Sequence, residues 1–431
     1  MTAAKDTPAL ALYRQAMRAF HSFAPGVLKK RIAAGKEDAA RWRERLGDSA
    51  VPRPAGPLVW FHGVSVGESL SALPAVEAIR ARRPDIHVLI TSATTTSAEI
   101  LSRRLPENAV HQFAPVDTPQ AVRAFLDHWR PDLAVFIESD IWPVLLGELD
   151  ARRVPRLLLS ARITEKTAKG WRRFRAAMAA LLGGYRAISA QDGASETRLK
   201  AMGPQVAARI APRANLKTLG APPPVDADKG AALKAMIGGR FVWLGASTHP
   251  GEDEAIAQTL EPGLLGGDLL ILAPRHPIRA ADIRAAVEGM GLRVAQRSRN
   301  ERIDDRVQVY LADTLGELGT LFTLSDIVVM GGGFLTGVGG HNPLEPARLG
   351  KSVVTGPDIA NWRGVYDDLI HDGAAQMVAA DALGPLLRRL RHHPDEVYAM
   401  DQRALAFSRR EDGALETVMA ILTPLLPEPR R

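Results

Sequence analysis

The sequence of 431 residues contains no cysteine. This absence excludes disulfide frameworks, thiolate-bound zinc, iron–sulfur clusters and cysteine nucleophiles, and it favours a reducing compartment. The sequence also lacks an uninterrupted run of about 20 apolar residues, which a membrane-spanning helix needs. Its longest uncharged stretch, 327–344, is rich in glycine and includes His341 and Asn342, so it is not a membrane span.

What the sequence does contain is typical of a globular protein. Hydrophobic residues make up 46% and charged residues 24%, which excludes a disordered or collagen-like chain. The length predicts two or three domains. The formal net charge of +7 favours a polyanionic partner such as nucleic acid, a phosphorylated lipid or a nucleotide.

Nearly all of the excess positive charge lies in the first 36 residues, which hold seven basic residues and one acidic residue. Arg14, Arg18 and His21 interrupt the apolar residues, so a spanning helix and a signal peptide are excluded. We predict a basic amphipathic helix on an anionic membrane surface, and the alternative is an ordinary helix packed on the protein. The apolar residues have helical spacing: Leu10, Tyr13, Met17, Phe20 and Val27.

Short apolar runs alternate with helical stretches along the rest of the chain. Continuous apolar runs are typical of buried parallel strands, and their alternation with helices predicts an α/β fold with two open, doubly wound sheets. The expected strands are 58–61, 87–91, 133–137, 156–160 and 186–189 in the first half, and 241–245, 269–273, 307–310, 327–330 and 352–355 in the second.

Three prolines in the segment 221–229 mark the boundary between the two halves. We therefore expect an N-terminal helical segment at 1–45, a first Rossmann-like domain at 46–220 and a second at 221–431. Two such domains facing a central crevice bind ligands at the carboxyl ends of their strands. The residues that follow the strands are therefore the candidates for the chemistry.

The run 62–69 follows the first expected strand, and Gly63 and Gly67 let the chain turn into a helix there. Glu68 lies in the first turn of that helix. A glutamate at this place is stabilised by the helix dipole, which is the purely structural interpretation. In the crevice, desolvation would instead raise the pKa of the Glu68 carboxyl towards the range of a general base.

A second acidic cluster, Glu138, Ser139 and Asp140, ends the expected strand 133–137. Ser139 or Asp140 fits a helix N-cap. Acids two residues apart would suit a metal, but no nearby histidine completes a ligand set. Glu138 is harder to explain structurally, because it ends a buried apolar run.

The second half offers an arginine and a glycine-rich loop as candidate phosphate sites. Arg275 and His276 follow the strand 269–273, and the arginine fork matches phosphate oxygens, although a surface arginine is the alternative. The run 331–333 is three glycines, which allow a ligand to approach the backbone closely.

A helix start follows the glycines. Asn342, Pro343 and Glu345 fit the N-cap, N1 and N3 positions of that helix. A glycine-rich loop before a helix start is typical of an anion site, so we predict phosphate binding there. Two weaker signals, Ser247–His249 and Asn215–Lys217, complete the candidates for the crevice.

In their order along the chain these motifs resemble those of the 3-deoxy-D-manno-octulosonic acid (Kdo) transferases of lipopolysaccharide synthesis, from about Arg41 to the C-terminal region. The Gly-Gly-His-Asn-Pro-Leu-Glu run and Ser-Val-Gly-Glu are the most specific. The matching motifs are His62–Glu68, Glu138–Pro143, Ser160–Arg162, Asn215–Lys217, Ser247–His249, Pro274–Pro277, Asp313–Leu318 and Gly339–Ala347.

The resemblance implies the two-domain GT-B fold and a metal-independent, inverting transfer. The family moves Kdo from CMP-Kdo to a tetraacylated, bisphosphorylated lipid A precursor at the cytoplasmic face of the bacterial inner membrane. It needs no bound cofactor. The N-terminal basic segment then gains a purpose, because the acceptor lies in a membrane, and we expect it to bind that surface peripherally.

The resemblance also implies roles for residues at matching positions. Glu68 matches the base that acts on the acceptor hydroxyl, and Glu138 and Lys217 match positions that stabilise the transition state. Preorganised donors must receive the negative charge that grows on the departing CMP. The positions expected to contact CMP are Arg275, His276, Leu315, Gly316, Glu317, Asn342, Pro343, Leu344 and Glu345, with Glu345 on the ribose hydroxyls.

Three positions depart from the family pattern. Gly63 replaces a serine, Asp140 replaces a glutamate, and Thr218-Leu219 follows Lys217 where the family commonly has Phe-Asp. The last change puts the setting of Lys217 in question.

Two other functions fit parts of the sequence. Another GT-B enzyme, a UDP-sugar transferase or epimerase, would use the same crevice. A non-enzymatic basic protein that binds nucleic acid or anionic lipid would explain the charge, but not the acids at the strand ends, so we expect no nucleic-acid partner.

Overall fold

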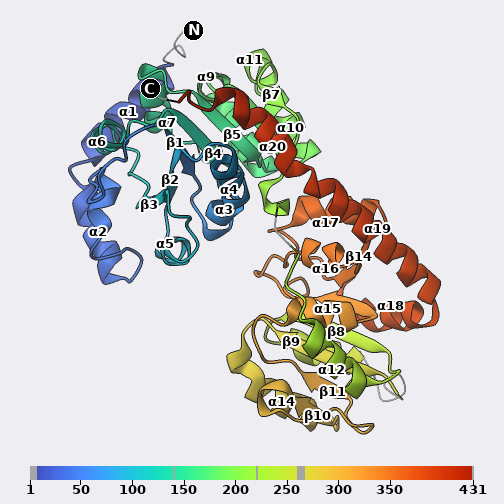
Figure 1. Ribbon diagram of the computed structural model, residues 1–431. Helices are drawn as coiled ribbons and strands as arrows, with labels where there is room; N and C mark the ends of the chain where they lie inside the picture. The colour runs from blue at the N-terminus through green and yellow to red at the C-terminus, as the bar shows by residue number, and fades with distance from the viewer. Residues whose placement is uncertain (1–6, 139–140, 220–221, 260–266, 430–431) are drawn as a thin grey trace. The chain divides into compact units, whose positions relative to one another are not determined.

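The structure is a computed structural model that describes residues 7–138, 141–219, 222–259 and 267–429. The chain divides into two units, Met1–Gly220 with Asp412–Arg431, and Ala221–Glu411. Each unit contains one seven-stranded parallel sheet with helices on both faces (Figure 1). Burial on both faces explains why the central strands are continuous apolar runs.

The sheet of the first unit has the strand order β3-β2-β1-β4-β5-β6-β7. The order reverses between β1 and β4, which makes this the topological switch point where ligands bind in open α/β sheets. The strands are β1 Leu58–His62, β2 His87–Ser92, β3 Ala109–Phe113, β4 Leu133–Ile137, β5 Arg156–Ala161, β6 Ala187–Ala190 and β7 Ile210–Ala211.

Alternate residues of these strands pack on opposite layers of helices. Leu58 and Trp60 of β1 join a core with α6, α7 and α9, whereas Val59 and Phe61 join a core with α4 and α20. The helices are α1 Pro8–Phe20, α2 Ala24–Ala33, η1 Trp42–Leu46, α3 Val66–Ser71, α4 Leu73–Arg82, α5 Thr95–Ser102, α6 Pro119–Trp129, α7 Pro143–Ala151, α8 Glu165–Trp171, η2 Arg172–Phe174, α9 Arg175–Gly183, α10 Gly193–Lys200, α11 Pro204–Ala207, η3 Leu216–Thr218, α20 Ala414–Leu422 and η6 Thr423–Leu425.

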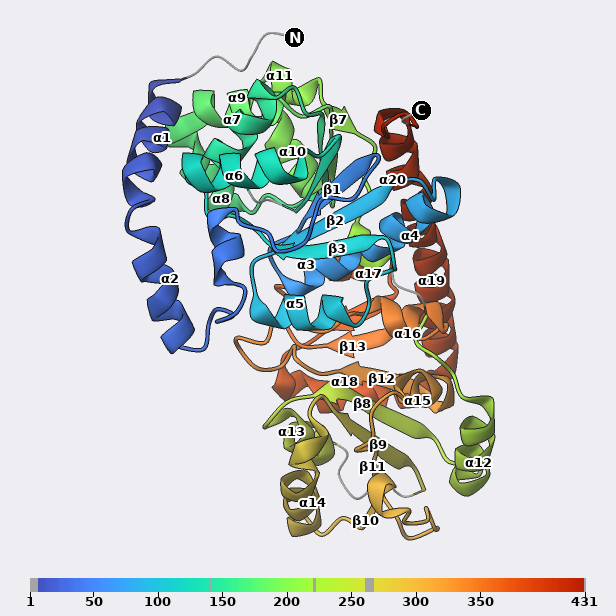
Figure 2. The same ribbon diagram turned by 60° about the vertical axis from the view of Figure 1, so that its left-hand side comes forward.

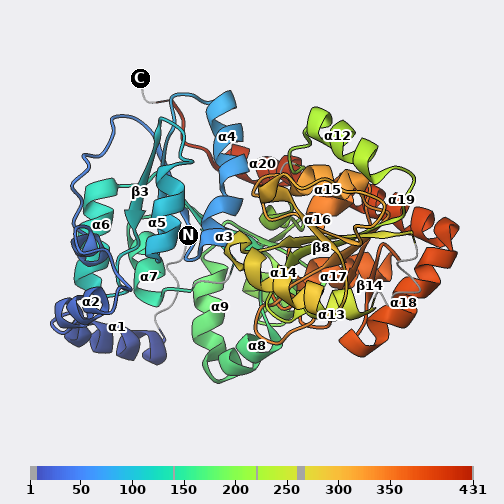
Figure 3. The same cartoon turned by 90° about the horizontal axis from the view of Figure 1, so that it is seen from below.

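The second unit repeats the arrangement with the order β10-β11-β9-β8-β12-β13-β14, and its order reverses between β8 and β12. Its strands are β8 Val242–Thr248, β9 Leu269–Pro274, β10 Val294–Gln296, β11 Val309–Leu311, β12 Ile327–Met330, β13 Val353–Thr355 and β14 Ala375–Met377. Its helices are α12 Ala227–Ile237, α13 Glu252–Thr259, η4 Pro277–Arg279, α14 Ala280–Gly289, η5 Arg297–Arg299, α15 Leu318–Leu324, α16 Leu344–Arg348, α17 Arg363–His371, α18 Ala380–His392 and α19 Pro394–Asp412. Helix α12 lies along α15, and α13 lies beside α14 (Figure 3).

The expected C-terminal boundary of the second domain, residue 431, is wrong. The second unit ends at Glu411, not at 431, because the last helix, α20, returns to the first unit and packs against α4. Val418, Met419 and Leu422 of α20 are buried in the core that α4 shares with β1. Burial of these apolar side chains away from water stabilises the C-terminal segment on the first unit.

The N-terminal segment forms two helices, α1 and α2, on the outer side of the first unit (Figure 2). Part of the stripe expected to face a membrane packs on the protein instead: Leu10 is buried, and Tyr13 and Met17 pack against the same core. Phe20 and Val27 remain exposed. In the described parts of the chain, no helix is long and apolar enough to cross a membrane.

Candidate active site

In the first unit, two of the acidic motifs meet at the topological switch point. Glu68 follows β1 and Glu138 follows β4, and these two strands pair in parallel. Their carboxyl ends therefore open on the same edge of the sheet. Helix α3, which carries Glu68, also contacts η3, which carries Lys217. The three residues expected to do the chemistry thus come from neighbouring elements.

Glu68 lies in a variant of the capping box at the start of α3, in which its carboxylate accepts from the backbone N–H of Val64, the residue before the N-cap. Ser65 is the N-cap, and its Oγ accepts from the Glu68 backbone N–H and donates to Glu68 Oε1, 2.8 Å away. The Val64 backbone N–H donates to Glu68 Oε2 at 2.7 Å. Each carboxylate oxygen thus has one donor and keeps a free lone pair. The side chain is half-buried, so the structural role and the role of a proton acceptor are compatible.

Glu138 is held in a strained position by a buried ion pair. Its backbone has a φ of +64°, in the left-handed region that costs energy for a residue with a Cβ. The residue is 8% exposed, and its carboxylate pairs with the ammonium of Lys217. Ser139 and Asp140, the candidate N-cap residues, lie outside the described residues.

Ser160 ties the Lys217 loop to the end of β5. It also has a positive φ, +53°. Its Oγ accepts from the Leu216 N–H at 2.6 Å and donates to the Ala214 carbonyl at 3.2 Å. Thr218 is buried and donates to the Asn215 carbonyl at 2.6 Å. The departure at Thr218 therefore leaves the loop around Lys217 fully hydrogen-bonded.

A buried histidine lies behind this site at the end of β1. His62 Nδ1 is 2.8 Å from Thr91 Oγ1, which also accepts from Trp60 Nε1. Burial, with a smaller effect of the positive charge of Arg45, lowers the pKa of His62 to about 3. The ring is therefore neutral at physiological pH and supports the loop as an uncharged group.

In the second unit, a group of histidines forms at the switch point between β8 and β12. His249 follows β8, and its Nε2 lies 2.9 Å from His341 Nε2, with the two rings stacked 5.1 Å apart. His276 meets His249 edge-on at 5.9 Å. Burial, then the neighbouring positive charges of His249 and Arg275, lowers the pKa of His341 to about 4.

Arg275 is the cation of this group. Its backbone N–H donates to the Thr248 carbonyl, while its side chain is exposed. Burial raises the pKa of the Glu345 carboxyl, and the amide of Asn342 and the charge of Arg275 oppose that rise. The charge of Arg275 thus acts on both Glu345 and His341, and His276 lies against His249 in the same group.

The glycines 331–333 are needed for the protein's own packing. A Cβ on Gly331 would lie 2.7 Å from the Ser247 carbonyl oxygen, and one on Gly333 would lie 2.5 Å from Thr355 Oγ1. The Gly332 N–H donates to Glu252 Oε2 at 2.7 Å. A carboxylate of the protein thus occupies a donor that a phosphate would use.

Glu252 was not singled out by the sequence, although its role in the loop is clear. It is 1% exposed and also accepts from the backbone N–H groups of His249 and Phe334 at 3.0 Å each. It therefore joins the loop after β8 to the loop after β12. The available signal is an acidic residue directly after the Pro250-Gly251 pair that follows the strand.

The helix after the glycines is α16, which begins at Leu344, one residue later than the capping argument places it. Asn342 Oδ1 accepts from the Leu344 N–H at 3.0 Å, and its Nδ2 lies 3.5 Å from Glu345 Oε1. Asn342 and Glu345 therefore interact through their side chains, but Pro343 and not Asn342 is the N-cap of α16. Pro343 and Leu344 are buried.

Glu317 is already saturated by partners in the second unit. Arg297 holds its carboxylate with two hydrogen bonds, of 3.0 and 2.8 Å, and Thr314 and Lys229 also contact it. The bond with Arg297 is the main reason that its pKa falls to about 2. Glu317 therefore orders its loop, and the exposed Leu315 and Gly316, at φ +83°, form the loop's outer part.

Comparisons with known proteins give a consistent family. A family model described as "3-Deoxy-D-manno-octulosonic-acid transferase (kdotransferase)" matches residues 40–219. The 3-deoxy-D-manno-octulosonic acid transferase of Rickettsia felis is 32% identical over 378 residues, covering 86% of this chain and 80% of the relative. A probable mitochondrial 3-deoxy-D-manno-octulosonic acid transferase of Arabidopsis thaliana is 32% identical over 344 residues, covering 78% of this chain and 76% of the relative.

Solved structures give the fold. A UDP-GlcNAc 2-epimerase from Neisseria meningitidis matches with a TM-score of 0.56 at 12% identity, covering 85% of this chain and 99% of that one. At this identity the likeness concerns the fold alone, and it confirms the expected GT-B architecture.

We predict that Lys217→Met destabilises the first unit, because it leaves the buried Glu138 carboxylate without its cation. The free energy of unfolding should fall by about 3 kcal/mol. The double variant Glu138→Gln/Lys217→Met should recover most of this loss. Urea denaturation followed by tryptophan fluorescence measures both.

Lys200→Met is the control, since it breaks the exposed pair of Lys200 with Glu196 and should cost less than about 1 kcal/mol. A double variant no more stable than Lys217→Met would show that the ion pair is not the cause.

We predict that stability depends on pH through His341. Between its ordinary pKa of 6.5 and its folded pKa of about 4, the unfolded chain binds a proton that the folded protein does not. Stability is therefore complete above about pH 6.5 and falls as the pH drops towards 4. In His341→Gln the slope of unfolding free energy against pH should shrink in this window. His392→Gln, at an exposed position of α18, should keep the wild-type slope, and equal slopes in all three proteins would refute the prediction.

Proposed function

The chain belongs to the 3-deoxy-D-manno-octulosonic acid transferases, a glycosyltransferase family, and we propose that it transfers Kdo from CMP-Kdo to the tetraacylated lipid A precursor at the cytoplasmic face of the bacterial inner membrane. The observation that carries the proposal is the group at the switch point of the first unit. There a half-buried carboxylate, Glu68, is oriented by two donors beside the buried Glu138–Lys217 pair.

In the proposed reaction Glu68 removes the proton from the acceptor hydroxyl. That oxygen attacks the anomeric carbon of Kdo as the bond from this carbon to the phosphate oxygen breaks, and the bond's electron pair leaves with CMP. One displacement of this kind inverts the anomeric centre. A positioned base contributes about 10²–10⁴-fold to such a step.

The role of Lys217 in this scheme is electrostatic. Its ammonium compensates the donor's carboxylate or phosphate, and Glu138 holds the ammonium in place and supports the oxocarbenium-like centre. Because both groups are fixed by hydrogen-bonded loops, little reorganisation is needed as charge develops.

The second unit takes the nucleotide in this proposal. Arg275 has an exposed guanidinium whose fork matches phosphate oxygens, and His276 is exposed beside it. The partly buried carboxyl of Glu345 takes the ribose hydroxyls. CMP should therefore compete with the donor, whereas UDP should not, which separates this function from that of a UDP-sugar enzyme.

We predict that Glu68→Gln abolishes transfer while CMP binding remains. Glutamine can replace glutamate at this position of a capping box, so α3 keeps its start, but an amide cannot accept the acceptor's proton. Turnover should fall by about 10²–10⁴-fold. Mass spectrometry of the lipid acceptor, with CMP-Kdo generated in situ, measures turnover, and calorimetry measures CMP binding.

Thr94→Ala is the matched control, because Thr94 caps the neighbouring helix α5 through its side chain and has no proposed role in the reaction. An equal loss in Thr94→Ala would show that the loss reports a weakened helix cap and not a missing base. Transfer that persists in Glu68→Gln would place the base elsewhere.

The first two helices carry a surface suited to the proposed membrane contact. An apolar stripe of Leu12, Phe20, Phe23 and Val27 stays exposed along α1 and α2, and the exposed Lys29 and Lys30 follow it. Exposed apolar side chains with adjacent lysines are typical of a peripheral contact with anionic lipid. The acceptor lipid would be taken from that surface.

We predict that Phe23→Ser lowers binding to vesicles that contain anionic phospholipid severalfold, as measured by flotation at low salt. Tyr398→Ser is the matched control, because Tyr398 is an aromatic side chain of the same exposure, 67% against 68%, on α19. Equal flotation of the two variants would remove α1 and α2 as the contact surface.

A further inference from the structure

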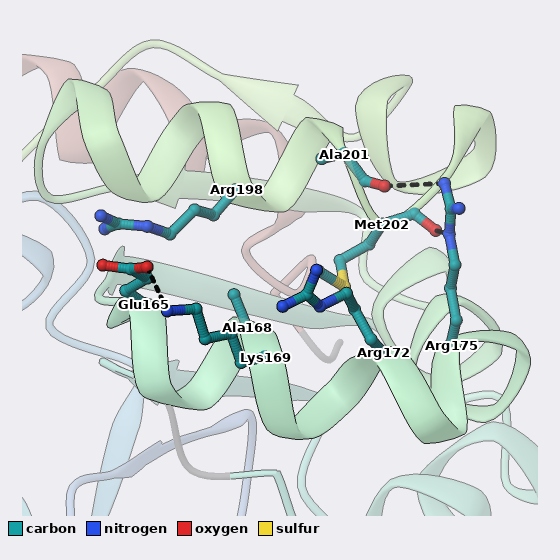
Figure 4. Close-up of a pocket in the computed structure, with 8 residues that line it drawn as sticks. All are labelled: Glu165, Ala168, Lys169, Arg172, Arg175, Arg198, Ala201 and Met202. Carbon is teal, nitrogen blue, oxygen red and sulfur yellow. Dashed lines mark hydrogen bonds and ion pairs between the residues drawn. The ribbon is translucent and has the colours of Figure 1, made fainter.

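A pocket of about 340 Å³ lies in the first unit, outside the residues assigned above (Figure 4). Its volume is within the range of about 300–1,000 Å³ that is usual for small-molecule sites. Helices α8 and η2 and the start of α9 form one wall, and α10 with the residues after it forms the other. Four of the lining side chains are cations, Lys169, Arg172, Arg175 and Arg198, and one is an acid, Glu165.

Two of the arginines are held by backbone carbonyls, and the charge of Arg198 also acts on the nearby Glu165. Arg198 Nη1 donates to the Ile163 carbonyl at 2.8 Å. Arg175 donates to the carbonyls of Ala201 and Met202 at 2.9 and 3.3 Å. A guanidinium has five N–H donors, so each arginine keeps several for a ligand.

The remaining cations differ in their pairing. Lys169 pairs with Glu165 at 2.5 Å. Arg172, in contrast, makes no hydrogen bond or ion pair with any residue in the described ranges. The pocket therefore carries a formal charge of about +3, and its floor at Met202 and Ala168 is apolar. Such a site suits an anion of high charge more than a single carboxylate.

The pocket is connected to the edge of the sheet where Glu68 lies. Ile163, which Arg198 holds, is in the loop between β5 and α8. In the sheet β5 is separated from β1 only by β4. Neighbouring strands lie about 4.8 Å apart, so the strand that leads into the pocket is about 10 Å from the strand that leads to Glu68. The loop that leads into the pocket and the loop that carries Glu68 therefore leave the same edge of the sheet.

We propose that this pocket binds a phosphate monoester of the lipid acceptor, with Arg172 as the cation left free for it. The inference rests on the proposed function, since it concerns the acceptor of that reaction. A phosphate monoester carries a charge of about −1.5 to −2 at pH 7 and three acceptor oxygens. The arginine forks match those oxygens in pairs.

The test compares Arg172→Gln with Arg173→Gln. Both residues are exposed in η2 and each substitution removes one positive charge, but only Arg172 lines the pocket. Transfer is assayed in detergent solution, so that adsorption to a membrane does not enter. Arg172→Gln should raise the KM for the phosphorylated acceptor about tenfold and leave the KM for CMP-Kdo unchanged, and Arg173→Gln should change neither.

A second arm uses an acceptor from which the phosphates have been removed. With this acceptor Arg172→Gln should behave as the wild type. The same loss with both acceptors, or the same loss in Arg173→Gln, would overturn the proposal. An unchanged KM together with weaker binding of Arg172→Gln to phospholipid vesicles would also overturn it, because the pocket would then bind the headgroups of the bilayer.

Equilibrium binding separates this inference from the proposed function. If the wild-type protein transfers no Kdo, the proposed reaction is wrong. Binding of the phosphorylated acceptor lipid in detergent, measured without donor, still tests the pocket. About tenfold weaker binding to Arg172→Gln than to Arg173→Gln would support the site, and equal binding would refute it.

Discussion

Parallel pairing of the central strands is the constraint on which the rest of the structure depends. Parallel neighbours need a crossover helix for each connection, so all carboxyl ends of a sheet open on one edge. Where the strand order reverses, successive crossovers go to opposite faces and leave room at that edge. In the first unit this place lies between β1 and β4, and in the second between β8 and β12. The motifs of Glu68 and Glu138, and those of His249 and the glycine loop, follow these four strands.

The site residues are held by the same interactions that end the strands and begin the helices. Glu68 belongs to the capping box of α3, so its orientation comes with the formation of the helix. Glu138, Ser160 and Ser247 all have positive φ at or next to a strand end, which turns each chain sharply. For residues with a Cβ this conformation costs about 1–3 kcal/mol and persists only where surrounding contacts impose it. The contacts of Lys217 and of Leu216 impose it on the first two.

Sequence reasoning found the centre of each sheet and missed its edges. The sequence predicts ten strands, and all ten are present, nine of them within two residues at either end and β8 extending three residues further, to Thr248. The four that were missed, β3, β7, β10 and β14, are the two outer strands of each sheet. An edge strand is covered on fewer sides, so it lacks the continuous apolar run that identifies a buried strand. In β3, for example, the first three residues are only partly buried.

The sequence pattern also does not predict contacts between segments that are far apart along the chain. The return of α20 to α4 depends on which apolar surface remains uncovered after both units form. The glycines at 331–333 indicate a close approach correctly, and the atoms that approach them within the protein are those of Ser247 and Thr355. The glycines indicate that a side chain would not fit at these positions, but only the fold shows which atoms approach them. For Asn342 and Glu345 the local pattern sufficed, because their contact spans one helical turn.

The distribution of internal partners explains where a polyanion can bind. Several acids near the strand ends are occupied by backbone N–H groups: Glu68 by Val64, Glu252 by Gly332, and Asp358 by Gly337. An acid that neutralises backbone donors does not neutralise arginines. Arg172 in the first unit and Arg275 in the second have no ion-pair partner in the described ranges, and neither do Arg175 and Arg198. Where an acid does meet an arginine, as Glu317 meets Arg297, the bidentate pair orders a loop and leaves no charge for a ligand. The engaged acids leave Arg172 and Arg275 without a carboxylate partner, which is the property that both proposed phosphate contacts require.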